Sequence, residues 1–210
     1  MSSKTRPGNF FEDFRVGQHL VHAPPRTVSS GDAALYTALF GSRFAVNSSD
    51  LFAQQLGLPR MPLDSMLVFH LVFGRTVADI SLNAIANLGY AGGVFGVPVY
   101  PGDTLSTDSR VIGLKPNKDG KTGVVYVRSS GTNQHGQTVL DYCRWVMVRK
   151  RDAEAATPRP WCPSCPKPWP WPSCIAPTRP LPRPTTPRAP AANSCGTTTP
   201  SASASTTSTA

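Results

Sequence analysis

Apolar residues are most concentrated in one short stretch of the chain, residues 66–73. This segment reads MLVFHLVF and is apolar on nearly every face of a helix. Asp64 or Ser65 can cap its N-terminus and Gly74 can end it, so we predict a helix over residues 64–73. A helix that is apolar nearly all round must be covered by protein on most sides. The run is far shorter than the roughly 20 residues that span a bilayer, and we expect no membrane association.

Two shorter helices are predicted before it. Residues 27–30, TVSS, supply N-cap candidates for a helix over residues 31–40, and Gly41 can end that helix. Ser49 can cap a second helix over residues 50–56, which the next residue, again a glycine, can end.

Downstream of these helices the pattern changes to that of strands. Four runs rich in β-branched and aromatic residues occupy residues 81–90, 104–112, 122–130 and 139–150. Short segments with turn-forming residues separate them, which predicts an antiparallel meander. One apolar helix followed by a long meander favours the hotdog fold, an α+β fold in which the sheet wraps the helix. A ferredoxin-like sandwich and a lipocalin-type barrel are the alternatives, but neither needs a helix that is apolar all round.

The composition changes abruptly near residue 157. All 12 Asp and Glu lie between Glu12 and Glu154, whereas residues 158–210 hold 14 of the 22 Pro, four of the five Cys and three of the four Trp. We therefore predict one domain at residues 1–157 and a disordered Pro/Ser/Thr-rich tail at residues 158–210.

The tail also has the composition that an out-of-frame reading of G/C-rich codons produces. When each codon is started on the third base of the preceding one, residues 195–210 can encode a string that contains DDYAVGERI. This string matches residues 12–20, EDFRVGQHL, position by position in character. We therefore expect a second copy of the domain in the shifted frame, with residues 1–157 as the N-terminal half of a double domain.

Charge and cysteine content narrow the classes of function. Residues 1–157 carry a net charge of +4, and five basic residues of the tail raise the total to +9. The domain has no basic stripe interleaved with aromatic residues, so we expect no nucleic-acid partner. Its single cysteine, Cys143, and the absence of an apolar signal region indicate the cytoplasm. Cys162 and Cys165 suggest zinc, but the remaining pair, Cys174 and Cys195, has the wrong spacing, and we expect no metal.

Two motifs resemble those of the MaoC-like acyl-CoA hydratases. Residues 11–17, FEDFRVG, resemble the opening of that family, and residues 95–105, FGVPVYPGDTL, are similar to its strand–turn–strand signature. The resemblance covers residues 9–151. It implies a hotdog fold, an acyl-CoA thioester as substrate without a further cofactor, and a homo-oligomer or a paired hotdog as the assembly.

The resemblance also assigns positions to the family's catalytic groups. An Asp and a His, a few residues apart, share a water across the enoyl double bond. Here Ser42 and Asn47 occupy those two positions, and neither side chain has a pKa suited to an acid or a base. In the family, backbone N–H groups at the start of the central helix polarise the thioester. On that resemblance we expect Asp64, Ser65 and Met66 to bind substrate.

Other polar residues are interpreted as structural. His70 is expected to be a core histidine and Cys143 a small buried residue. His19 and His22 lie on an edge-like strand, and the sequence places no acid beside them. The residues expected to act only as helix caps or turn residues are Asp13, Asp32 and Asp103.

Two functions therefore stay open. The first, which the resemblance implies, is a hydro-lyase that reversibly hydrates a branched, dicarboxylic enoyl-CoA. The second is a non-catalytic hotdog module that binds acyl-CoA or pairs with another hotdog domain. The residues at positions 42 and 47 favour the second for this polypeptide.

Overall fold

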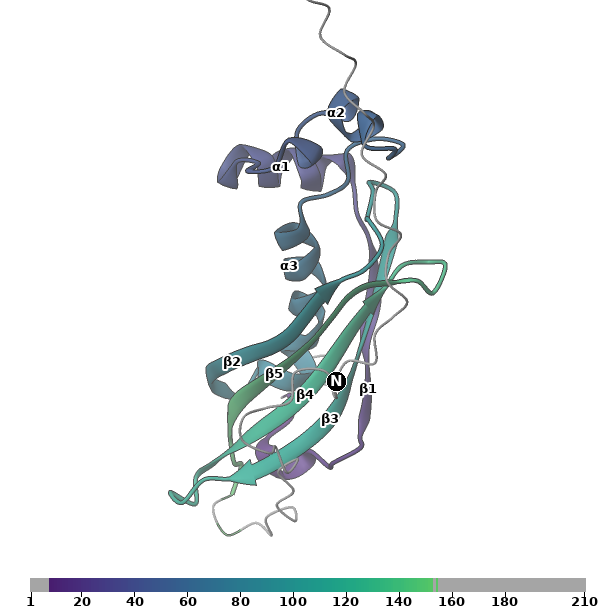
Figure 1. Ribbon diagram of the computed structural model, residues 1–210. Coiled ribbons are helices and arrows are strands. Elements are labelled where there is room, and N and C mark those ends of the chain that lie inside the picture. The colour runs from purple at the N-terminus through teal and green to yellow at the C-terminus, as the bar shows by residue number, and fades with distance from the viewer. Residues whose placement is uncertain (1–7, 153, 155–210) are drawn as a thin grey trace, which may run out of the picture. The chain divides into compact units, whose positions relative to one another are not determined.

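One antiparallel sheet organises the part of the chain that the computed structural model describes, residues 8–152 and residue 154. Its strands follow the order β1-β3-β4-β5-β2, and helix α3 lies along one face of it (Figure 1). The strands are β1 (His19–Thr27), β2 (Ala84–Phe95), β3 (Thr104–Pro116), β4 (Thr122–Thr132) and β5 (Thr138–Arg149). The predicted tail at residues 158–210, its shifted frame and its cysteines lie outside the described residues.

The helical segments precede β2 in the chain. They are η1 (Phe11–Asp13), α1 (Ser30–Phe40), η2 (Ala45–Asn47), α2 (Asp50–Gln55), α3 (Ser65–Thr76) and the π-helical turn η3 (Val77–Ser81). In Figure 1, α1 and α2 lie together beyond one end of α3. Within the described residues, no helix has both the length and the apolar character needed to cross a membrane.

Helix α1 begins and ends as the sequence predicts. The Ser29 hydroxyl accepts the Asp32 N–H at 3.1 Å, while the Asp32 carboxylate accepts the Ser29 N–H at 2.9 Å. This reciprocal pair is a capping box, which satisfies two N–H groups that the first helical turn leaves without partners. Gly41 follows the helix with a φ of 69°, a conformation that glycine adopts without steric strain.

Helix α3 confirms the predicted start but not the predicted end. The Asp64 carboxylate accepts the Met66 N–H at 2.8 Å and caps the helix. The helix then continues through Gly74 to Thr76 and into η3, so β2 begins three residues later than residue 81. A mid-helix glycine disfavours the helix by about 1 kcal/mol. Burial of Thr76 and Ile80 beyond it outweighs that preference.

The sheet and α3 enclose the larger of two apolar cores. Leu67, Val68 and Val72 of α3 are buried against the sheet. Gly131 on β4 allows this approach, because a Cβ at that position would lie only 2.5 Å from a Val72 methyl group. The second core lies around η1 and η3 and consists of Phe11, Phe14, Ile80, Val111, Leu114, Val125, Val127, Val146 and Val148.

The opposite face of α3 is open, contrary to the prediction that protein covers the helix on most sides. Met66 is 47% exposed, and His70 is exposed rather than part of the core. Phe69 and Phe73 are only partly buried. No segment of the described residues therefore covers the apolar side chains on this face of α3.

Candidate functional site

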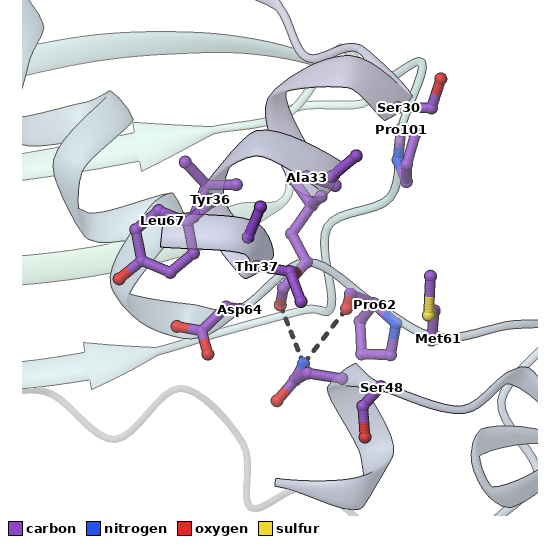
Figure 2. A pocket seen from close by; sticks show the side chains of 14 residues that line it. Ser30, Ala33, Tyr36, Thr37, Ser48, Met61, Pro62, Asp64, Leu67 and Pro101 are labelled. Atoms are coloured by element: carbon purple, nitrogen blue, oxygen red, sulfur yellow. Dashed lines mark hydrogen bonds between the residues drawn. The ribbon is translucent and has the colours of Figure 1, made fainter. Parts of the chain in front are cut away.

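A cavity of about 430 Å³ lies between α1, η2 and the N-terminal end of α3. Figure 2 shows Tyr36 and Thr37 of α1, with Asp64 and Leu67 from the start of α3, among the side chains that line it. Most of the lining is apolar, and Asp64 is the single carboxylate in it. Asp64 stands at the start of α3, among the residues that the family resemblance implies for substrate binding.

Asn47 is one of the lining residues, and its orientation is fixed. Its side-chain Nδ2 donates to the carbonyl oxygens of Pro62 and Leu63, each at 3.1 Å, as the dashed lines in Figure 2 show. These two bonds tie η2 to the segment that leads into α3. The amide therefore has a clear structural role, and it offers no group that can gain or lose a proton near neutral pH.

Ser42 does not line this cavity. Its hydroxyl donates to the carbonyl oxygen of Phe44 at 3.2 Å, which closes a local turn after α1. Of the two positions that the resemblance assigns to the catalytic pair, the structure thus brings only Asn47 to the cavity wall.

The three residues expected to bind substrate lie in different places. Asp64 lines the 430 Å³ cavity and Ser65 lines a neighbouring one of about 180 Å³, whereas Met66 lines neither and is half-exposed. The Asp64 carboxylate already accepts the Met66 N–H. A negative charge at the helix N-terminus also disfavours an enolate there, because the positive end of the helix dipole is already neutralised. Burial, and secondly the charge of Asp64, raises the pKa of the Tyr36 phenol.

A buried network that the sequence did not reveal lies near the other end of α3. His22 Nδ1 is 2.7 Å from the Asp79 carboxylate, and His22 Nε2 is 2.8 Å from Ser109 Oγ. Ser109 Oγ is in turn 2.7 Å from Ser129 Oγ. Because a carboxylate only accepts, Nδ1 carries the proton toward Asp79 and Nε2 accepts from Ser109 in the neutral ring. His22 is 2% exposed, whereas the Asp79 side chain is 26% exposed and lines another cavity of about 580 Å³. The network joins η3 to the sheet.

The structure thus gives His19 and His22 the acid partners that the sequence could not name. His19 Nε2 lies 3.0 Å from the Asp108 carboxylate of β3, and the acid of His22 comes from η3. Both partners are more than 50 residues away in the sequence. Only the pairing of β1 with β3 and the end of α3 bring them together, so no local signal could have found them.

The structure settles the remaining candidates. Asp13 accepts the Phe10 N–H and Asp103 accepts the Tyr100 N–H, at 2.9 and 2.7 Å, so both act in a cap or turn as expected. Cys143 is only half-buried, which differs from the expectation of a buried residue, because its side chain alternates away from the buried positions of β5. Within residues 8–152, no group of three or more His, Cys, Asp or Glu side chains is placed to hold a metal ion.

Known proteins share this chain's sequence and fold. A family model described as "MaoC like domain" matches residues 12–133. A β-methylmalyl-CoA dehydratase of Chloroflexus aurantiacus is 70% identical over 166 residues, which are 79% of this chain and 47% of that protein. A mesaconyl-CoA hydratase of Cereibacter sphaeroides is 59% identical over 160 residues, 76% of this chain and 47% of that protein. A Mycobacterium tuberculosis protein whose structure has a double hotdog fold is 32% identical at a TM-score of 0.63, over 69% of this chain and 45% of that one.

These similarities confirm the predicted hotdog fold and exclude the ferredoxin-like and lipocalin-type alternatives. They also confirm the family resemblance that the sequence motifs indicated. The chain spans about half the length of the curated relatives that it matches.

Proposed function

The chain belongs to the MaoC-like domain family, and we propose that it is one half of an enzyme that reversibly hydrates mesaconyl-CoA to β-methylmalyl-CoA. In this reaction the hydroxyl of water adds to the β-carbon of the enoyl thioester and a proton adds to the α-carbon. The reverse reaction removes the same water. The identities of 70% and 59% to proteins named for these two directions support the choice of substrate.

Within that enzyme, we assign this chain the role of binding and shaping rather than proton transfer. The observation that carries the assignment is the pair Ser42 and Asn47, of which one closes a turn and the other holds two backbone carbonyls. The remaining titratable groups of the cavity are Asp64, which caps α3, and Tyr36, whose raised pKa keeps the phenol protonated. None of these groups is suited to abstract a proton from water at neutral pH.

A second hotdog unit is the proposed partner, and the edge strand β2 is the proposed place of contact. Exposed apolar side chains follow β2 along the sheet edge; they are Ile85, Leu88, Tyr90, Val94 and Phe95, each between 39% and 49% exposed. An unpaired apolar edge strand is a surface to which another strand adds readily. The double hotdog fold of the M. tuberculosis protein supports a second hotdog unit as the partner that contacts β2. The unit is a second copy of this chain or a separate half.

The proposal needs no cofactor, since the coenzyme A thioester is itself the substrate. We also keep the cytoplasm as the proposed location, on the sequence argument that residues 1–157 contain one cysteine and hence no disulfide framework.

The test titrates the 210-residue chain with mesaconyl-CoA in a calorimeter and follows the enoyl-thioester absorbance of the same mixture. We expect saturable binding without turnover. Binding too weak to detect, with coenzyme A alone and with the thioester, contradicts the acyl-CoA role. Turnover at the rate of a full-length relative contradicts the non-catalytic assignment.

A further inference from the structure

Arg144 on β5 is a buried cation whose hydrogen-bonding groups are mostly unused. Its side chain has 0% exposure. One terminal nitrogen donates to Thr76 Oγ1 at 2.8 Å, while Nε and the other terminal nitrogen have no partner. The guanidinium lies over the Phe73 ring, 4.7 Å from its centroid. A single neutral hydroxyl and one ring are poor compensation for a desolvated guanidinium.

No carboxylate among the described residues neutralises this charge. The ion pairs within residues 8–152 all involve other basic side chains. The ionisable neighbours of Arg144 are Tyr142 and Tyr90. The buried Tyr142 hydroxyl makes no hydrogen bond of good geometry, although Ser129 and Thr76 lie close to it. Burial lowers the pKa of Arg144 and raises that of Tyr142, so the environment disfavours both charged forms. A buried ion without a partner is strongly unfavourable, which indicates that the counter-charge comes from outside this part of the chain.

The surroundings of Arg144 link it to the open face of α3. Tyr142 packs against Phe69 and Tyr90 with ring centroids 5.5 and 6.2 Å apart, and Phe69 stacks on Phe73 at 5.7 Å. Phe69, Phe73 and Tyr90 are all partly or half exposed. Arg144 therefore lies beneath a layer of partly exposed aromatic rings, on the side of α3 that faces β2.

If two hotdog units pair through β2, the substrate site of the second unit comes close to Arg144. Arg144 contacts Phe73, which lies nine residues after the cap Asp64, or about 14 Å along α3 at 1.5 Å per residue. An acyl group with a four-carbon backbone, bound at the start of this helix, cannot reach so far. A two-fold axis normal to the sheet, however, makes the helix of a second hotdog unit run antiparallel to α3. The N-terminal end of the partner's helix then lies at the level of the C-terminal half of α3.

We propose that Arg144, with the Tyr142 hydroxyl, binds the free carboxylate of a dicarboxylic acyl-CoA whose thioester is held by the paired hotdog unit. The two unused guanidinium nitrogens match a carboxylate in the bidentate geometry that arginine favours. The Tyr142 hydroxyl can donate a third bond. This inference rests on the proposed function, because that function supplies both the paired unit and a substrate with a free carboxylate.

The experiment compares mesaconyl-CoA with 2-methylcrotonyl-CoA in its E form, where a methyl group replaces the free carboxylate. Both are titrated into the 210-residue chain and into its Arg144→Met and Arg110→Met variants; Arg110 is an exposed arginine of β3. We expect the unmodified chain and Arg110→Met to bind mesaconyl-CoA roughly tenfold tighter or better, as charge-assisted pairs are strong when desolvated. Arg144→Met should lose this preference and keep the affinity for 2-methylcrotonyl-CoA.

Thermal unfolding separates carboxylate recognition from a structural role. Arg144→Met should unfold at the same or a higher temperature, because an apolar side chain replaces an unpaired buried charge. Free mesaconate, which needs no coenzyme A site, should raise the unfolding temperature of the unmodified chain and leave that of Arg144→Met unchanged. If mesaconate acts in this way but neither thioester binds, the proposed function fails while the carboxylate site stands.

Three results would overturn the proposal and leave the acyl-CoA function intact. One is equal affinity of the unmodified chain for the two thioesters. Another is a parallel loss of both affinities in Arg144→Met together with a lower unfolding temperature, which marks a structural residue. The third is loss of self-association in Arg144→Met with an unchanged preference between thioesters, which assigns the carboxylate to a neighbouring protein chain.

Discussion

The two ends of α3 satisfy their polar groups in different ways. At the N-terminal end, Asp64 caps the helix two residues away and Asn47 bonds to carbonyls 15 and 16 residues away. Near the C-terminal end, His22 reaches Asp79 and Ser109 across 57 and 87 residues. The cavity in which the family's chemistry is expected lies at the first end. The side chains of Asp64 and Asn47 there hydrogen-bond to backbone groups. The second end is built from long-range contacts, and there Arg144 still lacks a counter-charge.

Under the proposed function, this chain keeps the fold of a hotdog unit while another unit supplies the groups for proton transfer. Local capping preserves the position and shape of the cavity without requiring an acid or a base in it. The long-range network holds η3 against the sheet and fixes the depth of α3. Variants of the cavity residues should therefore affect activity and binding, whereas variants of the network of His22, Asp79 and Ser109 should affect stability.

The largest expected effect concerns activity at the N-terminal end. The 210-residue chain should hydrate mesaconyl-CoA at least about 10²- to 10⁴-fold more slowly than the full-length C. sphaeroides relative, since a general acid or base contributes a factor of this size. The decrease in enoyl-thioester absorbance measures both proteins at equal subunit concentration. A heat-unfolded sample of the chain supplies the background rate. Comparable rates would mean that the catalytic groups lie elsewhere, with Asp64 and Tyr36 as the first to be replaced.

The next effect concerns stability at the other end. Replacing Ser109 with alanine leaves His22 Nε2 and Ser129 Oγ without a bond that each makes in a buried site. We expect a loss of about 1–3 kcal/mol in the free energy of unfolding. Urea denaturation followed by circular dichroism measures it, and Ser106→Ala, on an exposed position of the same strand, is the matched control. Equal free energies of unfolding for the two variants would mean that this network does not stabilise the protein.

The same contrast explains which features the sequence could predict. Local groups determine the helix starts at Ser29 and Asp64 and the helix ends before Gly41 and Gly57, as the sequence predicts. The strands follow from β-branched runs between turns, but only β3, β4 and β5 form the predicted meander, because β2 pairs with β5 instead of β3. Where long-range packing overrides local preference, prediction was wrong, as when α3 continued through Gly74.

Side-chain environments across the sheet could not be predicted for the same physical reason. His22 was left without an acid and His70 was placed in the core. The buried Arg144 was not singled out at all, because alternation in β5 indicates which face it lies on but not that its neighbours are aromatic. Of the candidate site, the position at the start of α3 was predicted, whereas the separation of Ser42 from the cavity was not.

Substitutions on the edge strands of the sheet should have a smaller effect, which is on self-association. The β2 edge carries Leu88, 44% exposed, whereas the β1 edge carries the exposed Val21 beside two prolines that cannot donate to a neighbouring strand. Leu88→Lys should weaken self-association roughly tenfold, because a charge is placed in an apolar contact. Val21→Lys should leave it unchanged. Sedimentation velocity over a range of concentrations measures both. The opposite ranking, or a monomeric unmodified chain, contradicts β2 as the contact edge.

The smallest effect concerns the capping box of α1, at the end of the molecule where local bonds dominate. The backbone and side-chain hydrogen bonds from Ser29, together with the charge of Arg26, hold the pKa of Asp32 below its usual value. A carboxyl group whose pKa is lowered by folding stabilises the protein above its unfolded pKa of about 3.9, and this contribution is lost as the pH falls through the folded pKa. Asp32→Ala should therefore lower the free energy of unfolding by about 0.5–1 kcal/mol at pH 7. The gap to the unmodified chain should narrow steadily below pH 4, whereas Ser30→Ala, next to the capping box, should show no such pH dependence. Urea midpoints measured between pH 3 and pH 7 give the comparison, and a gap that stays constant over this range would mean that the ionised carboxylate is not what stabilises the start of α1.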